Sequence, residues 1–189
     1  MFQKKNYKEA ITFFNKAIKI NPSRPDLYNN LSIALFQEKK FKEAIISWDN
    51  AIKIKPDYAE AFFNKGNVYS IIKDYKNSIK NFEEAIKIKK NYKEALNNLG
   101  NVYVEMKDYE RALEKFNLST QISPINPIEY NNIGNIYFEL KNFKKALENF
   151  DKALNIGRNF ALSYYNKAKT YKEINDNEKA VINYEKAIL

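Results

Sequence analysis

Asparagines recur at a fixed spacing in this sequence, and their side chains are the first candidates for chemistry. One series returns at a constant interval, at Asn30, Asn64, Asn98, Asn132 and Asn166. A second set lies three residues after three members of that series, at Asn67, Asn101 and Asn135. An amide side chain offers donors and an acceptor together, so a row of amides can satisfy the C=O and N–H groups of an extended peptide. The spacing predicts a surface that binds peptide backbone.

The composition argues against most catalytic chemistry. The 189 residues include no Cys and no His, which excludes Cys/His zinc sites and His-dependent nucleophiles. Only 4 glycines are present, too few for a Gly-rich phosphate loop. Carboxylate pairs such as Glu83 and Glu84 stand among lysines, as on a solvated helix face. We expect no enzyme activity, no metal and no cofactor.

The elements that carry the asparagines are copies of one unit. Small residues return at the same interval as the asparagines, at Ala10, Ala44, Ser78, Ala112, Ala146 and Ala180. Aromatic residues also keep this interval, at Phe14, Trp48, Phe82, Phe116, Phe150 and Tyr184. A constant interval of this kind is typical of repeat proteins in which neighbouring units stack to bury a continuous core.

Each unit reads as two helices, called A and B below. Apolar residues in the second half of a unit fall on one helical stripe, as in Phe41, Ala44, Trp48 and Ala51. Residues that cap helix N-termini stand where helix B must begin, at Asn6, Asp74, Asp108, Asn142 and Asp176. The chain is predicted to be one array over 1–189. It divides into a partial repeat at 1–24 (second helix only), full repeats at 25–58, 59–92, 93–126 and 127–160, and a truncated repeat at 161–189.

These columns resemble the tetratricopeptide repeat (TPR) family, whose pattern is W-x2-L-G-x2-Y, then A-x3-F, then A and P. The closest match in this chain runs Leu96-x2-Leu99-Gly100-x2-Tyr103, then Ala112-x3-Phe116, Ser119 and Pro124. The leading Trp of the family is replaced by Tyr, Phe or Leu. The resemblance implies an all-α fold, a right-handed α-solenoid of antiparallel helix pairs with a concave groove lined by the A helices.

The resemblance also gives the asparagines a place. In this family their positions face the concave groove, and Asn29, Asn97 and Asn131 are expected on the same surface. The series is similar to the asparagine ladder in TPR domains of O-linked N-acetylglucosamine transferases. A second interpretation needs no ligand: asparagines at this position hydrogen-bond between adjacent A helices. Aromatic residues at groove positions of the A helices, Phe36, Phe63, Phe138 and Tyr165, are either anchors for a ligand or packed laterally against the next A helix.

The charge is unevenly distributed. The net charge is +9, yet the A-helix portions of the five repeats hold five lysines and eight carboxylates, which leaves +12 on the rest of the chain. The groove should therefore prefer a neutral or basic extended segment over an acidic one. The lysine and arginine clamp with which co-chaperones of the family bind acidic EEVD-type tails is absent. Nucleic acid is not the expected partner, because the lysine column Lys5, Lys39, Lys73, Lys107 and Lys141 stands at helix C-termini, where cations complement the helix dipole.

The favoured function is a protein–protein interaction scaffold that binds an extended peptide segment of a partner. One alternative is the substrate-recognition TPR portion of a larger enzyme such as a glycosyltransferase. Another is a basic convex face that binds RNA or acidic partners. The longest uninterrupted apolar run, Ile33 to Phe36, is far too short for a membrane span, and residues 1–5 lack the apolar segment of a signal peptide. We therefore expect a cytoplasmic, intracellular protein without membrane contact.

Both ends of the sequence fall inside a repeat. Repeat arrays usually finish with a polar capping helix, and neither end shows one. We expect both terminal helices to expose apolar surface. The sequence would then be part of a longer protein, or a module that associates end to end with itself.

Overall fold

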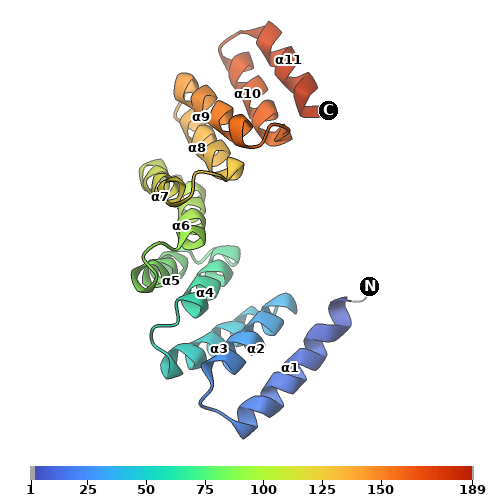
Figure 1. Cartoon of the computed structure of the whole chain (residues 1–189), viewed down its shortest axis with the longest axis vertical. Helices are drawn as coiled ribbons and strands as arrows, with labels where there is room; N and C mark the ends of the chain where they lie inside the picture. Colours follow the sequence, from blue (N-terminus) through green and yellow to red (C-terminus); the bar gives the residue numbers. More distant parts are fainter. Residues whose placement is uncertain (1–2, 189) are drawn as a thin grey trace. The chain divides into compact units, whose positions relative to one another are not determined.

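The computed structural model describes residues 3–188. Met1, Phe2 and Leu189 lie outside the described residues, and so does the part of the signal-peptide prediction that rests on the first two. Regular structure within 3–188 is helical throughout (Figure 1). The helices are α1 (Gln3–Ile20), α2 (Pro25–Gln37), α3 (Phe41–Ile54), α4 (Ala59–Ile71), α5 (Tyr75–Ile88), α6 (Lys93–Glu105), α7 (Tyr109–Ile122), α8 (Pro127–Glu139), α9 (Phe143–Ile156), α10 (Ala161–Glu173) and α11 (Asn177–Ile188). They form two units, Met1–Asn98 and Leu99–Leu189.

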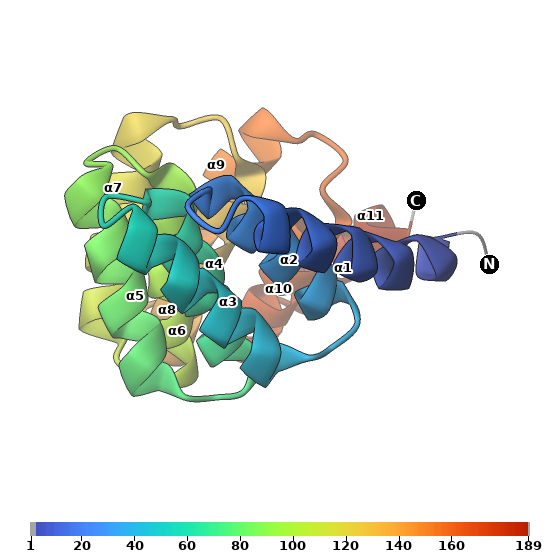
Figure 2. The same ribbon diagram turned by 90° about the horizontal axis from the view of Figure 1, so that it is seen from below.

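The predicted alternation of two helix types is confirmed. The A helices are α2, α4, α6, α8 and α10, and each has 13 residues. The B helices α3, α5, α7 and α9 each have 14 residues. In the first unit α1 packs against α2, and the pairs α2/α3 and α4/α5 follow one another (Figure 1, Figure 2). In the second unit the pairs are α8/α9 and α10/α11, with α10 also packed on α9.

The repeated columns form the core of each unit. The aromatic column of the B helices includes Trp48, Phe82, Phe116 and Phe150, all fully buried. A helices approach these rings closely where their small residue is glycine: a Cβ built on Gly134 would lie 2.5 Å from the Phe150 ring. Real Cβ contacts do not come this close, so the glycine is required there for helix packing rather than for backbone freedom.

Lysines in the turn from helix A to helix B adopt a left-handed backbone. Lys39, Lys73, Lys107 and Lys141 have φ between 57° and 60°, and Asn175 at the same place has φ 62°. In the first of these turns Lys40 N donates to Leu35 O and Lys39 N donates to Phe36 O, each at 2.9 Å. This is the Schellman arrangement, which usually places glycine at the left-handed residue. The lysine column does stand at helix C-termini, except for Lys5, which lies within α1.

The predicted caps of the B helices are confirmed in four of five places. Asp74, Asp108, Asn142 and Asp176 each accept a hydrogen bond from a backbone N–H three residues ahead, at 3.1–3.2 Å. The prediction for Asn6 is wrong, because α1 already begins at Gln3 and Asn6 lies inside it. The other four caps follow the tight turn from an A helix, whereas the residues just before Asn6 are Gln and Lys, which favour helix.

Candidate functional site

The predicted site asparagines all lie on A helices, but with different exposure. Asn30 on α2 and Asn101 on α6 are exposed. The other six are partly buried, namely Asn64, Asn67, Asn98, Asn132, Asn135 and Asn166. Residues three apart on a helix share one face, so Asn64 with Asn67, Asn98 with Asn101, and Asn132 with Asn135 each extend along one face of their helix.

One hydrogen bond joins asparagines of neighbouring repeats in the first unit. Asn98 Nδ2 on α6 donates to Asn67 Oδ1 on α4 over 2.8 Å. The interpretation that these asparagines link adjacent A helices is therefore realised at this pair. The bond uses one N–H and one oxygen, which leaves the Asn98 oxygen and the Asn67 amino group available to other partners.

The second unit repeats this bond once and then departs from it. Asn132 Nδ2 on α8 donates to Asn101 Oδ1 on α6 over 3.2 Å. Asn166 on α10 does not donate to the corresponding Asn135; it donates instead to Asn131 Oδ1, over 3.0 Å. Asn131 Oδ1 also accepts from Ser163 Oγ at 3.0 Å. The side chain of Asn135 has no hydrogen bond to another described residue and remains a free amide.

Two members of the neighbouring asparagine column, Asn29 and Asn131, are structural, which corrects the expectation that they face a ligand; the third, Asn97, is partly buried, and its Oδ1 has no hydrogen-bond partner among the described residues. Asn131 is fully buried. Asn29 is also buried; its Oδ1 accepts from Trp48 Nε1 at 2.9 Å, and its Nδ2 donates to Glu60 at 3.5 Å. Each of these amides satisfies polar groups that would otherwise be left unpaired in the core. The sequence signal for this role is that two other repeats place an aromatic residue, Phe63 or Tyr165, in the same column.

A cavity in the second unit brings four of the predicted asparagines together. Its volume is about 410 Å³, and Asn101, Asn132, Asn135 and Asn166 line it from α6, α8 and α10. Val104 and Phe138 supply apolar wall, and Glu139 and Lys169 bring one charge of each sign. Such a mixture of apolar surface and a few convergent polar groups is typical of ligand sites.

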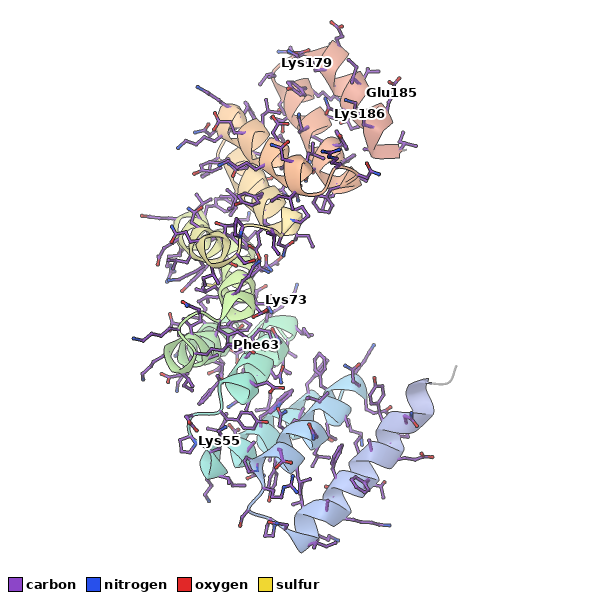
Figure 3. The ribbon with its side chains drawn as sticks, viewed as in Figure 1. Lys55, Phe63, Lys73, Lys179, Glu185 and Lys186 are labelled. Carbon is purple, nitrogen blue, oxygen red and sulfur yellow. The ribbon has the colours of Figure 1, made fainter. Side chains whose placement is uncertain are left out.

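The aromatic residues of the A helices are engaged in packing. The Phe63 ring on α4 (labelled in Figure 3) lies 5.9 Å from the Phe82 ring and 5.0 Å from the Tyr92 ring. Burial beside Phe63, with Glu60 and Glu94 nearby, raises the pKa of Tyr92 to about 12.

The rings of Phe36 and Tyr165 likewise contact Phe41 and Tyr184, at 5.8 and 5.7 Å. Phe138 differs from them, because it packs on Phe143 at 5.7 Å and also lines the asparagine cavity. Lys169 Nζ stands 5.1 Å from the centre of the Phe138 ring. Phe138 is therefore the aromatic that combines lateral packing with a place in the candidate site.

Two further features bear on the class of site. Within residues 3–188, no three carboxylates gather closely enough to hold a metal ion. None of the helices in the described part of the chain has the length and apolar character needed to cross a membrane.

Comparisons with known proteins place the chain. Family models described as TPR repeat match residues 1–38 and 33–70, and models described as tetratricopeptide repeat match 57–124, 127–160 and 161–189. No curated protein matches the sequence.

Solved structures agree on the fold. The C-terminal part of a TPR repeat-containing protein from Cytophaga hutchinsonii has a TM-score of 0.85 at 20% identity, over 99% of this chain and 75% of that chain. The Pseudomonas aeruginosa protein pilF has a TM-score of 0.81 at 23% identity, over 96% and 82%. YrrB, described as a TPR protein with an unusual peptide-binding site, has a TM-score of 0.76 at 24% identity, over 93% and 90%. With its helix pairs, buried columns and matching family models, the chain belongs to the tetratricopeptide repeat family and is an all-α solenoid of TPR repeats.

Proposed function

We propose that this protein–protein interaction scaffold binds an extended peptide segment of a partner at the asparagines of its A helices. The observation that carries the proposal is the cavity of the second unit, where Asn101, Asn132, Asn135 and Asn166 converge. The first unit offers a further amide surface at Asn64, Asn67 and Asn98. Asn30, exposed on α2, is the most peripheral member of the set.

The hydrogen bonds between asparagines leave some of the amide N–H and C=O groups without a partner. After the Asn132–Asn101 bond, Asn132 keeps its oxygen and Asn101 keeps its amino group. Asn135 keeps both. A peptide in extended conformation presents N–H and C=O groups on each side, so these amides can bind its backbone without selecting a sequence. The bonds between asparagines also fix their rotamers, which lowers the entropy lost on binding.

Selectivity would come from the wall of the cavity. Val104 and Phe138 form an apolar surface that suits one large apolar side chain of the peptide. The charged residues that line this cavity, Glu139 and Lys169, carry opposite charges that offset one another. A neutral segment therefore fits the cavity well. The exposed carboxylates Glu105 on α6 and Glu139 on α8 would attract a basic segment and repel an acidic tail.

The test uses the full chain and a displayed library of unstructured peptides. Peptides selected on the wild-type chain are synthesised, and their affinities are measured by fluorescence anisotropy. The variant Asn132→Ala/Asn135→Ala should weaken binding at least tenfold, or about 1.4 kcal/mol. The matched control is Asn155→Ala, an exposed asparagine on α9 away from the cavity.

A second arm tests the chemistry of recognition. N-methylation of the peptide backbone at the bound segment removes N–H donors and should abolish binding, whereas side-chain changes at most positions should not. The proposal fails if the double variant and the control bind equally well, or if the library yields only folded or helical ligands.

A further inference from the structure

The asparagine cavity of the second unit contains an aromatic ring that already holds a cation. Lys169 on α10 places its Nζ 5.1 Å from the centre of the Phe138 ring on α8, and both side chains line the cavity. The two helices contact each other within the second unit. The face of an aromatic ring attracts ammonium and guanidinium groups through its quadrupole. The Phe138 ring is therefore a surface on which a positively charged group can lie.

A carboxylate stands beside that ring. Glu139 directly follows Phe138 in the sequence, is exposed, and also lines the cavity. Neither Glu139 nor Lys169 forms an ion pair with another residue of the described range 3–188. By contrast, Lys167 on the same helix as Lys169 pairs with Asp151. The cavity thus offers an aromatic face and a carboxylate that has no cation of its own.

This pair of residues is particular to one repeat. Of the five A helices, only α8 has a carboxylate directly after an aromatic residue at these two positions. On α2 the ring is present as Phe36, but Gln37 follows it, and on α6 the carboxylate is present as Glu105, but Val104 precedes it. The ring position holds a serine on α4 and a lysine on α10. A surface for a cation is therefore a property of this cavity and not of the asparagine series as a whole.

Lys169 replaces an amide of that series. The residue at its position is asparagine in the three preceding repeats, namely Asn67, Asn101 and Asn135. Lys169 is exposed, and a cation lying on a ring at an exposed site is held weakly. An incoming cation can displace it at little cost, because the lysine stem is flexible and the freed ammonium is readily hydrated.

We propose that the asparagine cavity receives an arginine side chain of the bound peptide segment, which displaces Lys169 from the Phe138 ring and pairs with Glu139. This arginine subsite depends on the proposed function, because the asparagines hold the backbone of the same segment. Arginine suits the subsite better than lysine, since its planar guanidinium stacks on a ring and presents a fork of N–H donors to a carboxylate. Val104 supplies apolar wall for its methylene stem.

Lys169 has a role of its own in the free chain. It covers the ring that the arginine needs, and its charge repels the arriving guanidinium. Lys169 therefore lowers the affinity for an arginine-bearing segment and has little effect on a neutral one. Its removal should increase the preference for arginine, which is the opposite of what loss of a ligand-binding residue would do.

The test compares three short peptides with blocked ends, acetyl-Ala-Ala-X-Ala-Ala-amide, in which X is arginine, citrulline or glutamate. Citrulline keeps the shape of arginine without its charge. Binding to the isotope-labelled full chain is measured from the NMR shifts of the asparagine side-chain amides. We expect the arginine peptide to bind wild type about threefold more tightly than the citrulline peptide, and Lys169→Ala about tenfold more tightly. Glu139→Gln should remove most of the preference.

Two control variants make the same changes of charge away from the cavity. Lys172 on α10 and Glu105 on α6 are exposed and do not line it. Lys172→Ala and Glu105→Gln should each change the preference for arginine by less than about twofold, because charges separated by solvent are screened. If they change it as much as Lys169→Ala and Glu139→Gln do, the effect is one of net charge and the arginine subsite is overturned.

The remaining outcomes separate the subsite from the proposed function. Equal binding of the arginine and citrulline peptides by Lys169→Ala overturns the subsite, while shifts of the Asn132 and Asn135 amides in both titrations would still support backbone binding. Tighter binding of the glutamate peptide overturns the subsite in favour of an anion at Lys169. An arginine preference with unchanged affinity in Asn132→Ala/Asn135→Ala supports the subsite and contradicts the proposed function. Absence of shifts with all three peptides overturns both.

Discussion

Asn98 on α6 donates to Asn67 on α4 across the boundary between two repeats, over 2.8 Å. Both side chains are partly buried. The bond thus stabilises the stacking of A helices and orients two amides that the proposed function requires. Asn98→Ala should lower the free energy of unfolding by about 0.5–1.5 kcal/mol, the usual net value of such a bond, measured by urea denaturation.

Asn30→Ala is the matched control for that measurement. Asn30 is exposed and its side chain makes no hydrogen bond to a described residue, so the change should stay within about 0.5 kcal/mol of wild type. Equal losses for Asn30→Ala and Asn98→Ala would show that helix propensity, rather than the bond, is being measured.

Lys65 on α4 forms an ion pair with Asp49 on α3, across a repeat boundary of the first unit. The Lys65 side chain is 11% exposed and that of Asp49 is 55% exposed. Asp49→Ala leaves a nearly buried ammonium without its carboxylate and should cost about 1–3 kcal/mol. Lys65→Met/Asp49→Ala should recover most of that loss, because no buried charge remains.

The exposed pair Lys87 and Glu84 provides the comparison for that prediction, since the two side chains are 76% and 39% exposed. Glu84→Ala should change the stability by less than about 1 kcal/mol. If the double variant were as unstable as Asp49→Ala, the cost would lie in lost packing and not in the unpaired charge.

Lys73, labelled in Figure 3, lies in the turn between α4 and α5. Its φ is 60°. Glycine adopts this backbone region without the Cβ clash that other residues suffer. Lys73→Gly should therefore raise the urea midpoint, by up to about 1 kcal/mol in stability. Lys80→Gly, at an exposed position in the middle of α5, should instead lower stability by about 1 kcal/mol. A loss from both substitutions would contradict the strained turn.

Gly134 on α8 has no room for a side chain, because an added Cβ would lie 2.5 Å from the Phe150 ring. Gly134→Ala should cost about 1–3 kcal/mol through overpacking, and Phe150→Leu in the same chain should relieve part of the clash. The same column on α10 holds Ala168, which is buried with its Cβ in place. Ala168→Gly should thus destabilise as well, for the opposite steric reason, and thermal unfolding of the variants checks both.

Tyr92 should make the first unit sensitive to alkali. Burial first, and then the charges of Glu60 and Glu94, raise its pKa to about 12, whereas a free tyrosine ionises near pH 10. Between these two values the unfolded chain has lost the proton that the folded chain retains, so stability falls as pH rises through this window.

Tyr92→Phe should flatten the dependence of the urea midpoint on pH in that range. The difference in tyrosinate absorbance between wild type and variant should report the high pKa directly. A wild-type and a variant curve of the same slope above pH 10 would contradict the raised pKa.

The repeat, the helix pairs and the buried columns could all be predicted from the amino-acid pattern alone. A constant period with small and aromatic residues in register leaves little choice, because each helix pair must bury its apolar face on the next. The caps of the B helices could likewise be predicted from local chemistry, because each capping side chain accepts a hydrogen bond from a backbone N–H only three residues ahead. These caps are Asp74, Asp108, Asn142 and Asp176. At Asn6 the same residue type does not cap, because what precedes it is helix.

The partners of side chains that pair across repeats were decided only by the packing of the helices in the tertiary structure. Periodicity shows which residues share a column, but not whether a side chain reaches its own helix, the next repeat or solvent. Asn131 and Asn166 illustrate the limit: both belong to asparagine columns, yet one is fully buried and accepts from the other. The pair of Lys65 with Asp49 depends equally on how one helix lies on another. Local signals act within a few residues, whereas these partners are brought together by packing between helices.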